Sequence, residues 1–242
     1  MEVTSTEVQN NFGTYLKLTQ VEDVYITRNG KRIAVLRRWE EPRTETLKAA
    51  EGAAAYGTDR PRMTVEEFRK LSEASDARYE YIDGEVYLLA SPSWAHQRIV
   101  LEIAHCIQDW ARGRKCQPVT APFDVTLFKE DKENIVQPDI VVVCDSENID
   151  DRGRYTGVPS LVVEVLSEST RSKDMFQKMH VYMAGGVGEY WLVNPGNREV
   201  YIYRFADGEI ADYRVFKGTE TAGSEILAQL KIPLKQVFAA FA

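Results

Sequence analysis

Two acidic residues lie in stretches that otherwise belong in the interior of a sheet. Asp139 follows Pro138 and opens the apolar run 140–144, and Glu164 lies within the run 161–166. Both runs have the length of a strand, and a carboxylate inside such a run is costly unless it has a partner or a metal. Two carboxylates on adjacent strands are a usual way to hold a hard divalent cation. The sequence therefore predicts an oxygen-lined metal site, with magnesium (Mg²⁺) as the natural ion.

Composition indicates a folded globular protein. Hydrophobic residues make up 44% of the chain and charged residues 28%, which is close to the average for folded domains. The longest apolar stretches are only strand length, and the amino terminus lacks the basic-then-apolar layout of a secretion signal. We therefore expect a soluble cytoplasmic protein without a membrane segment.

The cysteines and histidines give no metal-binding pattern. Cys106, Cys116 and Cys144 are widely spaced and odd in number, so we expect inert, partly buried thiols and neither a disulfide framework nor a zinc site. The three histidines also lack metal-ligand spacing. Any metal should therefore be held by oxygen.

The charge balance neither predicts nor excludes a nucleic-acid partner. The formal net charge is -7, so the chain has no overall basic footprint. An enzyme that gathers carboxylates around a metal can still be acidic overall and carry local basic strips. DNA therefore remains an admissible partner.

Residues 1–40 predict a small module of a strand, a helix and a hairpin. Residues 2–4 alternate, and Ser5 or Thr6 can cap a helix of about 15 residues. Residues 24–27 and 32–36 flank Asn29-Gly30, which favours a type I′ hairpin turn. A unit this small buries little apolar area, so dimerisation through it is a reasonable hypothesis.

This module resembles the Phd/YefM antitoxin family. The matching residues are Ser5-Thr6-Glu7, Asn10-Asn11-Phe12-Gly13, Val24-Tyr25-Ile26-Thr27-Arg28-Asn29-Gly30-Lys31 and Ile33-Ala34-Val35-Leu36. The resemblance implies a DNA-binding, dimerising unit, and in the hairpin we take Arg28, Lys31 and Arg32 as the DNA contacts. The alternative is an unrelated β-α-β-β cap on the main domain.

Residues 41–61 are interpreted as a linker, because they are rich in charges, alanine and glycine and their apolar positions are sparse. In an antitoxin the corresponding tail binds a toxin. A segment that binds a partner toxin is therefore the alternative.

Residues 62–242 predict an α/β domain with a mixed α+β sheet. Thr64 and Glu67 have the spacing of a capping box for a helix over 63–71, and Asp83-Gly84 joins strands 78–82 and 85–89. Other expected helices cover 95–112, with Ile99, Ile103, Ile107 and Trp110 on one face, and 170–183. Expected strands cover 124–128, 139–144, 160–166, 190–194, 199–205 and 209–216.

This domain resembles the Uma-two type restriction endonucleases, a branch of the PD-(D/E)xK nucleases. The matching pieces are the segments 79–87, 91–93, 137–140, 158–167, 169–170 and 186–195, with His96, Asp174, Lys178 and Tyr182. The resemblance implies a restriction-endonuclease-like core that hydrolyses DNA phosphodiester bonds with Mg²⁺, which manganese (Mn²⁺) can replace. It implies that Asp139, Glu164 and Glu80 hold the metal.

One departure concerns the lysine of the general nuclease pattern, whose place two residues after Glu164 is taken by Leu166. Asp174, Lys178 and Tyr182 are four residues apart and share a helical face, which could deliver Lys178 toward Glu164. We assign Lys178 to stabilising the developing negative charge or orienting the water. His96 is expected to be a supporting residue that touches phosphate, and Asp174 is also in a supporting position. The competing interpretations are that Glu80 is a surface residue, that Lys178 only pairs with Asp174, and that His96 only begins a helix.

Three functions are consistent with the sequence. The first is a DNA endonuclease tethered to an antitoxin-like module, acting as a homodimer so that two sites cut two strands. The second is a DNA-binding repressor or toxin-antitoxin-type regulator whose nuclease fold is an inactive scaffold. The third is a self-contained toxin-antitoxin fusion, in which the amino-terminal module restrains the nuclease.

Overall fold

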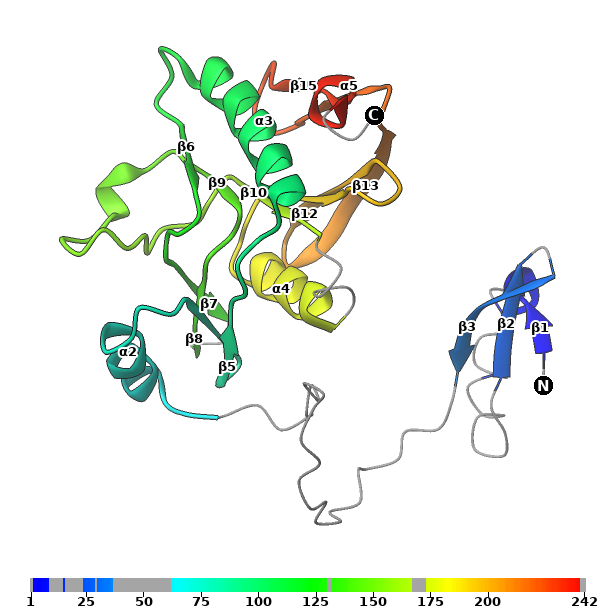
Figure 1. Cartoon of the computed structure of the whole chain (residues 1–242), viewed down its shortest axis with the longest axis horizontal. Coiled ribbons are helices and arrows are strands. Elements are labelled where there is room, and N and C mark those ends of the chain that lie inside the picture. Colours follow the sequence, from blue (N-terminus) through cyan, green and yellow to red (C-terminus); the bar gives the residue numbers. More distant parts are fainter. Residues whose placement is uncertain are drawn as a thin grey trace. The chain divides into compact units, whose positions relative to one another are not determined.

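The computed structural model of the chain separates into two compact units, Met1–Tyr56 and Gly57–Ala242 (Figure 1). The structure describes residues 2–8, 15, 24–28, 30–36, 62–129, 132–166 and 173–239, with side chains in the helix that begins at residue 173 described from residue 177 onward. Each unit is described by itself. The expected linker 41–61 lies outside the described residues.

The smaller unit contains a three-stranded sheet. Strand β1 (Glu2–Thr4) pairs in parallel with β2 (Val24–Arg28), which pairs antiparallel with β3 (Lys31–Leu36). Gly30, in the β2–β3 turn, has a φ of 73°, a conformation that glycine adopts without steric cost. The strands and the hairpin therefore agree with the prediction, whereas most of the expected helix lies outside the described residues.

A six-stranded mixed sheet forms the centre of the larger unit, in the order β13-β12-β11-β10-β9-β6. Strands β10 and β11 are parallel, and the other neighbours in this sheet are antiparallel. The strand bounds are Gln117–Thr120 (β6), Ile140–Val143 (β9), Leu161–Val165 (β10), Glu189–Asn194 (β11), Glu199–Ala206 (β12) and Glu209–Lys217 (β13). The predicted mixed α+β architecture is confirmed.

A second sheet has four strands in the order β5-β4-β8-β7. Asp83 and Gly84 connect β4 and β5 in the expected hairpin, with φ angles of 50° and 86°, which are left-handed values typical of a type I′ turn. Strand β8 was not predicted, because three of its five residues, Lys132, Glu133 and Asn134, are polar. The bounds are Tyr79–Ile82 (β4), Glu85–Leu88 (β5), Val125–Lys129 (β7) and Lys132–Val136 (β8).

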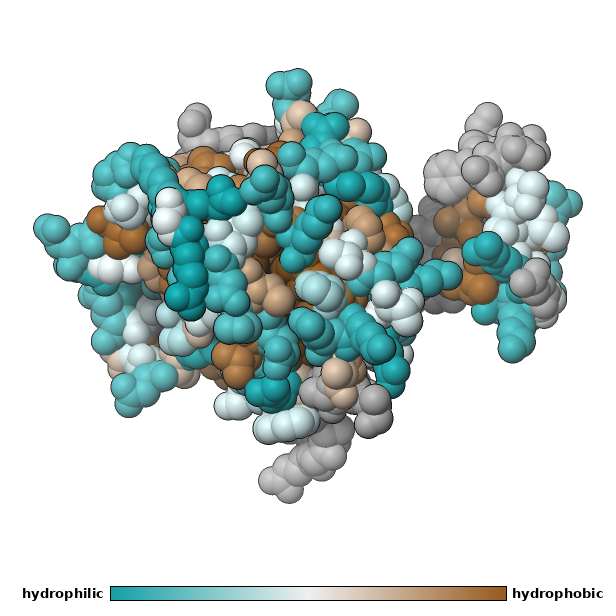
Figure 2. All heavy atoms as spheres, turned by 90° about the horizontal axis from the view of Figure 1, so that it is seen from above, coloured by the Kyte–Doolittle hydropathy of each residue, from teal (hydrophilic) through white to brown (hydrophobic). Residues whose placement is uncertain are grey.

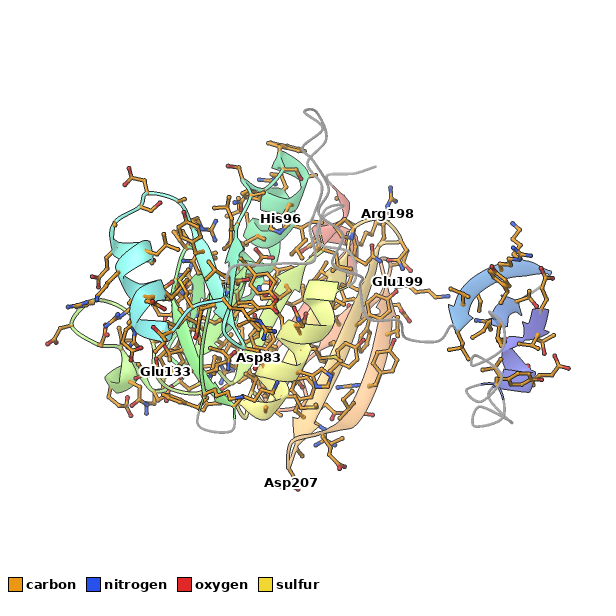
Figure 3. The ribbon with its side chains drawn as sticks, turned by 90° about the horizontal axis from the view of Figure 1, so that it is seen from below. Asp83, His96, Glu133, Arg198, Glu199 and Asp207 are labelled. Atoms are coloured by element: carbon orange, nitrogen blue, oxygen red, sulfur yellow. A yellow bond between two sulfur atoms is a disulfide. The ribbon has the colours of Figure 1, made fainter. Side chains whose placement is uncertain are left out.

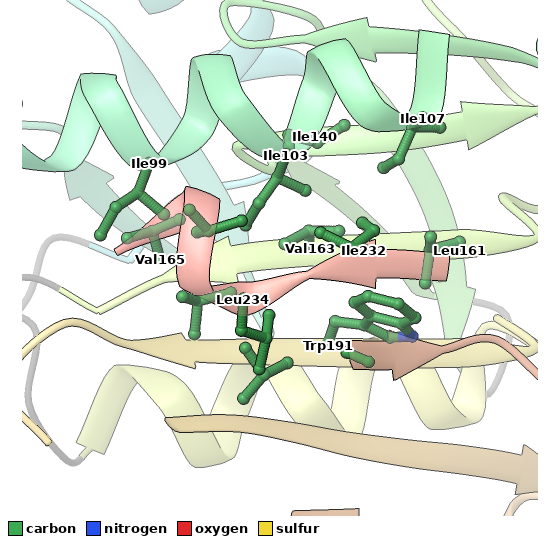
Figure 4. Close-up of a cluster of buried hydrophobic side chains, with 14 of the residues drawn as sticks. Ile99, Ile103, Ile107, Ile140, Leu161, Val163, Val165, Trp191, Ile232 and Leu234 are labelled. Atoms are coloured by element: carbon green, nitrogen blue, oxygen red, sulfur yellow. The ribbon is translucent and has the colours of Figure 1, made fainter. Parts of the chain in front are cut away.

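The two faces of the large sheet are covered by different elements. Helix α3 (Trp94–Ala111) packs on one face through Ile99, Ile103 and Ile107, as Figure 4 shows. The carboxy-terminal elements β14 (Thr221–Gly223), β15 (Lys231–Pro233) and α5 (Leu234–Val237) join this cluster. Helix α4 (Lys173–Ala184) and residues of β7 and β8 pack on the other face. Because successive strand residues alternate between faces, the face with Val162 also receives Glu164.

Helix α2 (Val65–Glu73) starts at the predicted capping box. The Thr64 hydroxyl accepts from the Glu67 backbone N–H, and the Glu67 carboxylate accepts from the Thr64 backbone N–H. Phe68 of this helix packs on Tyr81 with ring centroids 5.1 Å apart. Among the described residues no helix combines the length and the apolarity needed to span a membrane, and apolar side chains are scattered among hydrophilic ones on the face shown in Figure 2.

The expectation of three free thiols was wrong for two of them. Cys116 and Cys144 form a disulfide, and of the three cysteines only Cys106 remains free. The register of β6 and β9 places Gln117 opposite Val143, so the two cysteines are the next pair along the same ladder. A separation of 28 residues in sequence gave no hint of this neighbourhood, because it arises from strand pairing.

Glu189 is a fully buried carboxylate with neutral partners. Its Oε2 accepts from the Trp191 indole Nε1 at 2.9 Å, and its Oε1 accepts from the backbone N–H of Glu225 at 2.7 Å. Glu189 therefore ties the segment before β15 to the central sheet.

We predict that Glu189→Ala destabilises the protein by about 3 kcal/mol, because it leaves the Trp191 indole and the Glu225 amide without acceptors and opens a cavity. Urea unfolding of the full chain, followed by fluorescence, measures this effect. Glu147→Ala is the control, since Glu147 is exposed and lies 3.5 Å from Lys115 in a surface ion pair. Equal stability of the two variants would contradict the structural role of Glu189.

Candidate active site

The pairing of β9 with β10 brings Asp139 and Glu164 together. Val163 lies opposite Ile140, so the next position along this antiparallel ladder places Asp139 beside Glu164. The Val165 backbone N–H donates to Asp139 Oδ2 at 2.8 Å, which fixes this carboxylate at the end of β9. The two carboxylates predicted from the apolar runs therefore meet on adjacent strands.

Glu80 reaches the same place from the smaller sheet. Its side chain is buried, and its Oε1 accepts from the Gln137 backbone N–H at 2.8 Å. The Gln137 side chain in turn accepts from Arg78 Nε and donates to Asp124 Oδ1, both at 2.8 Å. Gln137 had no predicted role, although it immediately precedes Pro138-Asp139. It ties the approach to Asp139 to strand β4.

Lys178 of α4 lies between two of the carboxylates. Its Nζ is 2.8 Å from Glu80 Oε1 and 2.6 Å from Glu164 Oε1. One helical turn later, the Tyr182 hydroxyl donates to Glu164 Oε1 at 2.5 Å. The shared helical face predicted for these positions therefore points at Glu164. Lys178 of α4 lies beside Glu164, although the position two residues after Glu164 is a leucine.

Burial and mutual repulsion control the charges of this group. Burial raises the pKa of Glu164 to about 7; Lys178 opposes this change, whereas the charges of Asp139 and Glu80 add to it. Burial by itself lowers the pKa of Lys178, but Glu164 and Glu80 outweigh it and raise this pKa, so the ammonium stays charged. Burial, followed by the charges of Glu164 and Glu80, holds the pKa of Tyr182 well above its usual range, so its hydroxyl remains a donor.

His96 supports Asp139 from the first turn of α3, where Figure 3 labels it. Its Nε2 lies 3.1 Å from Asp139 Oδ2, and its Nδ1 is buried without a hydrogen-bond partner among the described residues. Burial lowers the pKa of His96, but the hydrogen bond and the charge of Asp139, together with Glu164, outweigh burial and raise it. His96 therefore does more than begin a helix.

Each of the three carboxylates is anchored through a single oxygen. The hydrogen bonds and ion pairs among the described residues end on Glu80 Oε1, Asp139 Oδ2 and Glu164 Oε1, and none ends on the second oxygen of these groups. Carboxylate oxygens are the ligands that hard divalent cations prefer, so this donor set fits such an ion. Within the described residues, however, no three His, Cys, Asp or Glu side chains are already grouped closely enough to hold a metal.

The structure thus brings together Glu80, His96, Asp139, Glu164 and Lys178. Glu80 is not a surface residue, and Lys178 contacts Glu80 and Glu164. The side chain of Asp174 lies outside the described residues. The proposed DNA contacts belong to the smaller unit: Arg28 and Lys31 are exposed at the β2–β3 turn, and Arg32 pairs with Glu2 at 2.6 Å.

The larger unit is similar to known proteins. The family Uma2, described as "Putative restriction endonuclease", matches residues 65–235. The uncharacterized protein slr1290 of Synechocystis sp. is 26% identical over 148 residues, which cover 61% of this chain and 76% of that protein. The uncharacterized protein sll1609 of the same organism is 26% identical over 134 residues, covering 54% and 75%.

A crystal structure from Anabaena variabilis, titled as a putative nuclease belonging to DUF820, shares the fold. It superposes with a TM-score of 0.61 at 22% identity, covering 73% of this chain and 98% of that one. The matched family segment contains all five residues that meet in the candidate site and most of the chain. The chain belongs to the Uma2 family of restriction-endonuclease-like proteins.

Proposed function

We propose that the larger unit is an endonuclease that hydrolyses DNA phosphodiester bonds with Mg²⁺ as its cofactor, for which Mn²⁺ can substitute. The observation that carries the proposal is the convergence of Glu80 and Glu164 on Lys178, with Asp139 beside Glu164. Carboxylates on adjacent strands with a nearby ammonium suit the hydrolysis of a phosphate ester, since they combine cation binding with stabilisation of negative charge. Family membership supports the same reaction class.

Magnesium, when bound, supplies Lewis acidity toward the scissile phosphate and the attacking water. Glu80, Asp139 and Glu164 would hold the ion, and each carboxylate is already anchored by a hydrogen bond from the protein. Tyr182 fixes the orientation of Glu164, whereas His96 and the Val165 N–H fix Asp139. These contacts restrain the ligands before the substrate arrives.

Lys178 supplies the positive charge that the negatively charged phosphate requires. Its ammonium remains protonated between Glu80 and Glu164, so it donates hydrogen bonds and takes no part as a base. When the cation occupies the carboxylates, Lys178 is placed to stabilise the charge that develops on the phosphate oxygens. The leucine at position 166 and the net charge of -7 favour the alternative, a DNA-binding regulator with an inactive nuclease fold. The position of Lys178 beside Glu164 counters the first of these two observations.

The smaller unit extends the proposal to DNA binding and dimerisation. Arg28 and Lys31 face each other at the tip of an exposed hairpin, which is a suitable place for phosphate contacts. A homodimer held through this unit would bring two nuclease sites to one duplex. A toxin-binding role for residues 41–61 falls on residues outside those described.

We predict that the full chain cleaves plasmid DNA in Mg²⁺ or Mn²⁺ and that Asp139→Asn and Glu164→Gln reduce cleavage to the level of a protein-free control. Each substitution keeps the shape of the side chain but removes the charge that holds the cation. Glu133→Gln is the matched control, because Glu133 lies in β8 and pairs with Arg69 at 2.7 Å, away from the candidate ligands. If wild type fails to cleave DNA with either metal, or if all variants cleave equally, the proposed activity is wrong.

We further predict that Lys178→Met lowers the cleavage rate by about 10²–10³-fold while Mn²⁺ binding is retained, because the ammonium acts on the phosphate and is not a ligand. Single-turnover cleavage and calorimetric Mn²⁺ titration separate the two effects.

The metal-free Lys178→Met variant should also be less stable by about 3–5 kcal/mol, since it leaves Glu80 and Glu164 buried without their cation. Lys129→Met, which breaks an ion pair with Asp83, serves as control; unchanged cleavage by Lys178→Met would exclude the assigned role.

A further inference from the structure

Strand β13 ends the six-stranded sheet with an unpaired edge. It pairs with β12 on one side, and no other strand among the described residues pairs with it. It is nine residues long and contains no proline. Three large apolar side chains are exposed on it, namely Ile210, Tyr213 and Val215 at 45%, 47% and 41%. A long, exposed edge of this kind is a template for pairing with another strand.

The sequence of β13 is self-complementary about Tyr213. Reversing the strand places Asp212 opposite Arg214 and Ala211 opposite Val215. The same reversal places Ile210 opposite Phe216, and Glu209 opposite Lys217 at the ends. Every charged residue thus meets the opposite charge, and every apolar residue meets an apolar one. An antiparallel pair of identical strands creates these oppositions around a twofold axis.

A row of tyrosine rings on the neighbouring strands leads to the edge strand β13. Tyr190, Tyr203 and Tyr213 lie in one row across β11, β12 and β13, because each is the register partner of the next. Their ring centroids are 6.0 Å and 5.0 Å apart along this row. The row ends at the half-exposed ring of Tyr213. A second Tyr213 directly opposite would continue it on the same face of the sheet.

We propose that two copies of this chain pair antiparallel through β13, with Tyr213 on the twofold axis. On the opposite face Arg214 already pairs within its own chain with Asp212 at 3.3 Å and with Glu225 at 3.2 Å. In the dimer, Asp212 and Arg214 of the second copy extend this group of charges and set the register, since a shift by one residue removes their contact. Figure 3 shows the hairpin that carries this strand, with Asp207 at its turn and Glu199 at its far end. A bulge in the β12–β13 pairing, at Ala211, bends the strand near the turn, so the pairing is centred on residues 211–215.

A disulfide cross-link at the axis tests the pairing in the full chain. In the Cys106→Ser background, Tyr213→Cys places two thiols directly opposite each other, with Cα atoms about 5 Å apart, which suits a disulfide. Val215→Cys is the matched control, because its exposure is similar but its own counterpart lies about 13 Å away along the strand. Mild oxidation followed by a non-reducing gel measures the cross-link, and circular dichroism checks that both variants fold.

We expect a covalent dimer from Tyr213→Cys and monomer from Val215→Cys. This difference is independent of any other surface through which the chains associate, since only the β13 register distinguishes the two positions. Equal cross-linking of both variants would indicate random collision, and no cross-link from Tyr213→Cys would mean that the edge is free or takes a different partner. Either outcome overturns the proposal.

Charge exchange between copies provides a second test. Asp212→Arg places arginine opposite arginine in a self-paired dimer, and Arg214→Asp places aspartate opposite aspartate, so each should weaken self-association through β13 by roughly tenfold or more. A mixture of the two variants restores both opposite-charge pairs. Analytical ultracentrifugation should therefore show tighter association in the equimolar mixture than in either variant alone. A mixture that associates no more tightly than the separate variants would contradict the pairing, because intramolecular effects of the substitutions do not change on mixing.

Discussion

The Lys178 ammonium lies between Glu80 and Glu164, and these ion pairs connect three elements that are distant in sequence, namely α4, β4 and β10. Glu80 comes from the four-stranded sheet, Glu164 from the six-stranded sheet and Lys178 from the helix that follows β10. A buried carboxylate or ammonium is costly alone, so each charge is tolerated only when the other two elements are in place. The candidate site therefore forms only when the two sheets pack correctly. A chain with a misplaced sheet would leave uncompensated charge in its interior.

A chain of contacting aromatic rings connects this group to the edge of the six-stranded sheet. Tyr182, which donates to Glu164, packs on Tyr190 at 5.2 Å between ring centroids, and Tyr190 begins the row that reaches Tyr213 at the edge. Aromatic rings in contact stabilise each other beyond the area that they bury. The hydroxyl that orients Glu164 is thus supported by a layer of rings that continues to the strand proposed to meet a second copy.

Local patterns predicted the elements that depend on neighbours in sequence. The Thr64–Glu67 capping box, the Asp83-Gly84 turn and the buried isoleucines of α3 all follow from spacing, and the structure has each of them. The shared face of Lys178 and Tyr182 also follows from helical spacing. Apart from the meeting of Asp139 with Glu164, features that depend on register were not predictable. The disulfide between Cys116 and Cys144, the polar strand β8 and the bridging role of Gln137 require knowledge of which strands pair.

A carboxylate in an apolar strand is an incomplete signal for a site, as Glu189 demonstrates. Glu189 precedes the run 190–193 on β11, the strand paired with β10, and it is fully buried, whereas the Glu164 side chain is 14% exposed. Both of its oxygens accept from neutral N–H donors, which distribute its charge without a cation. Glu164 instead faces Lys178, has Asp139 and Glu80 as charged neighbours, and keeps one oxygen without a donor among the described residues. The difference lies in the neighbours that the fold provides. Several acidic groups around one cation produce a charge excess that a divalent ion relieves, whereas a single carboxylate surrounded by N–H groups is already satisfied and serves only to hold the structure together.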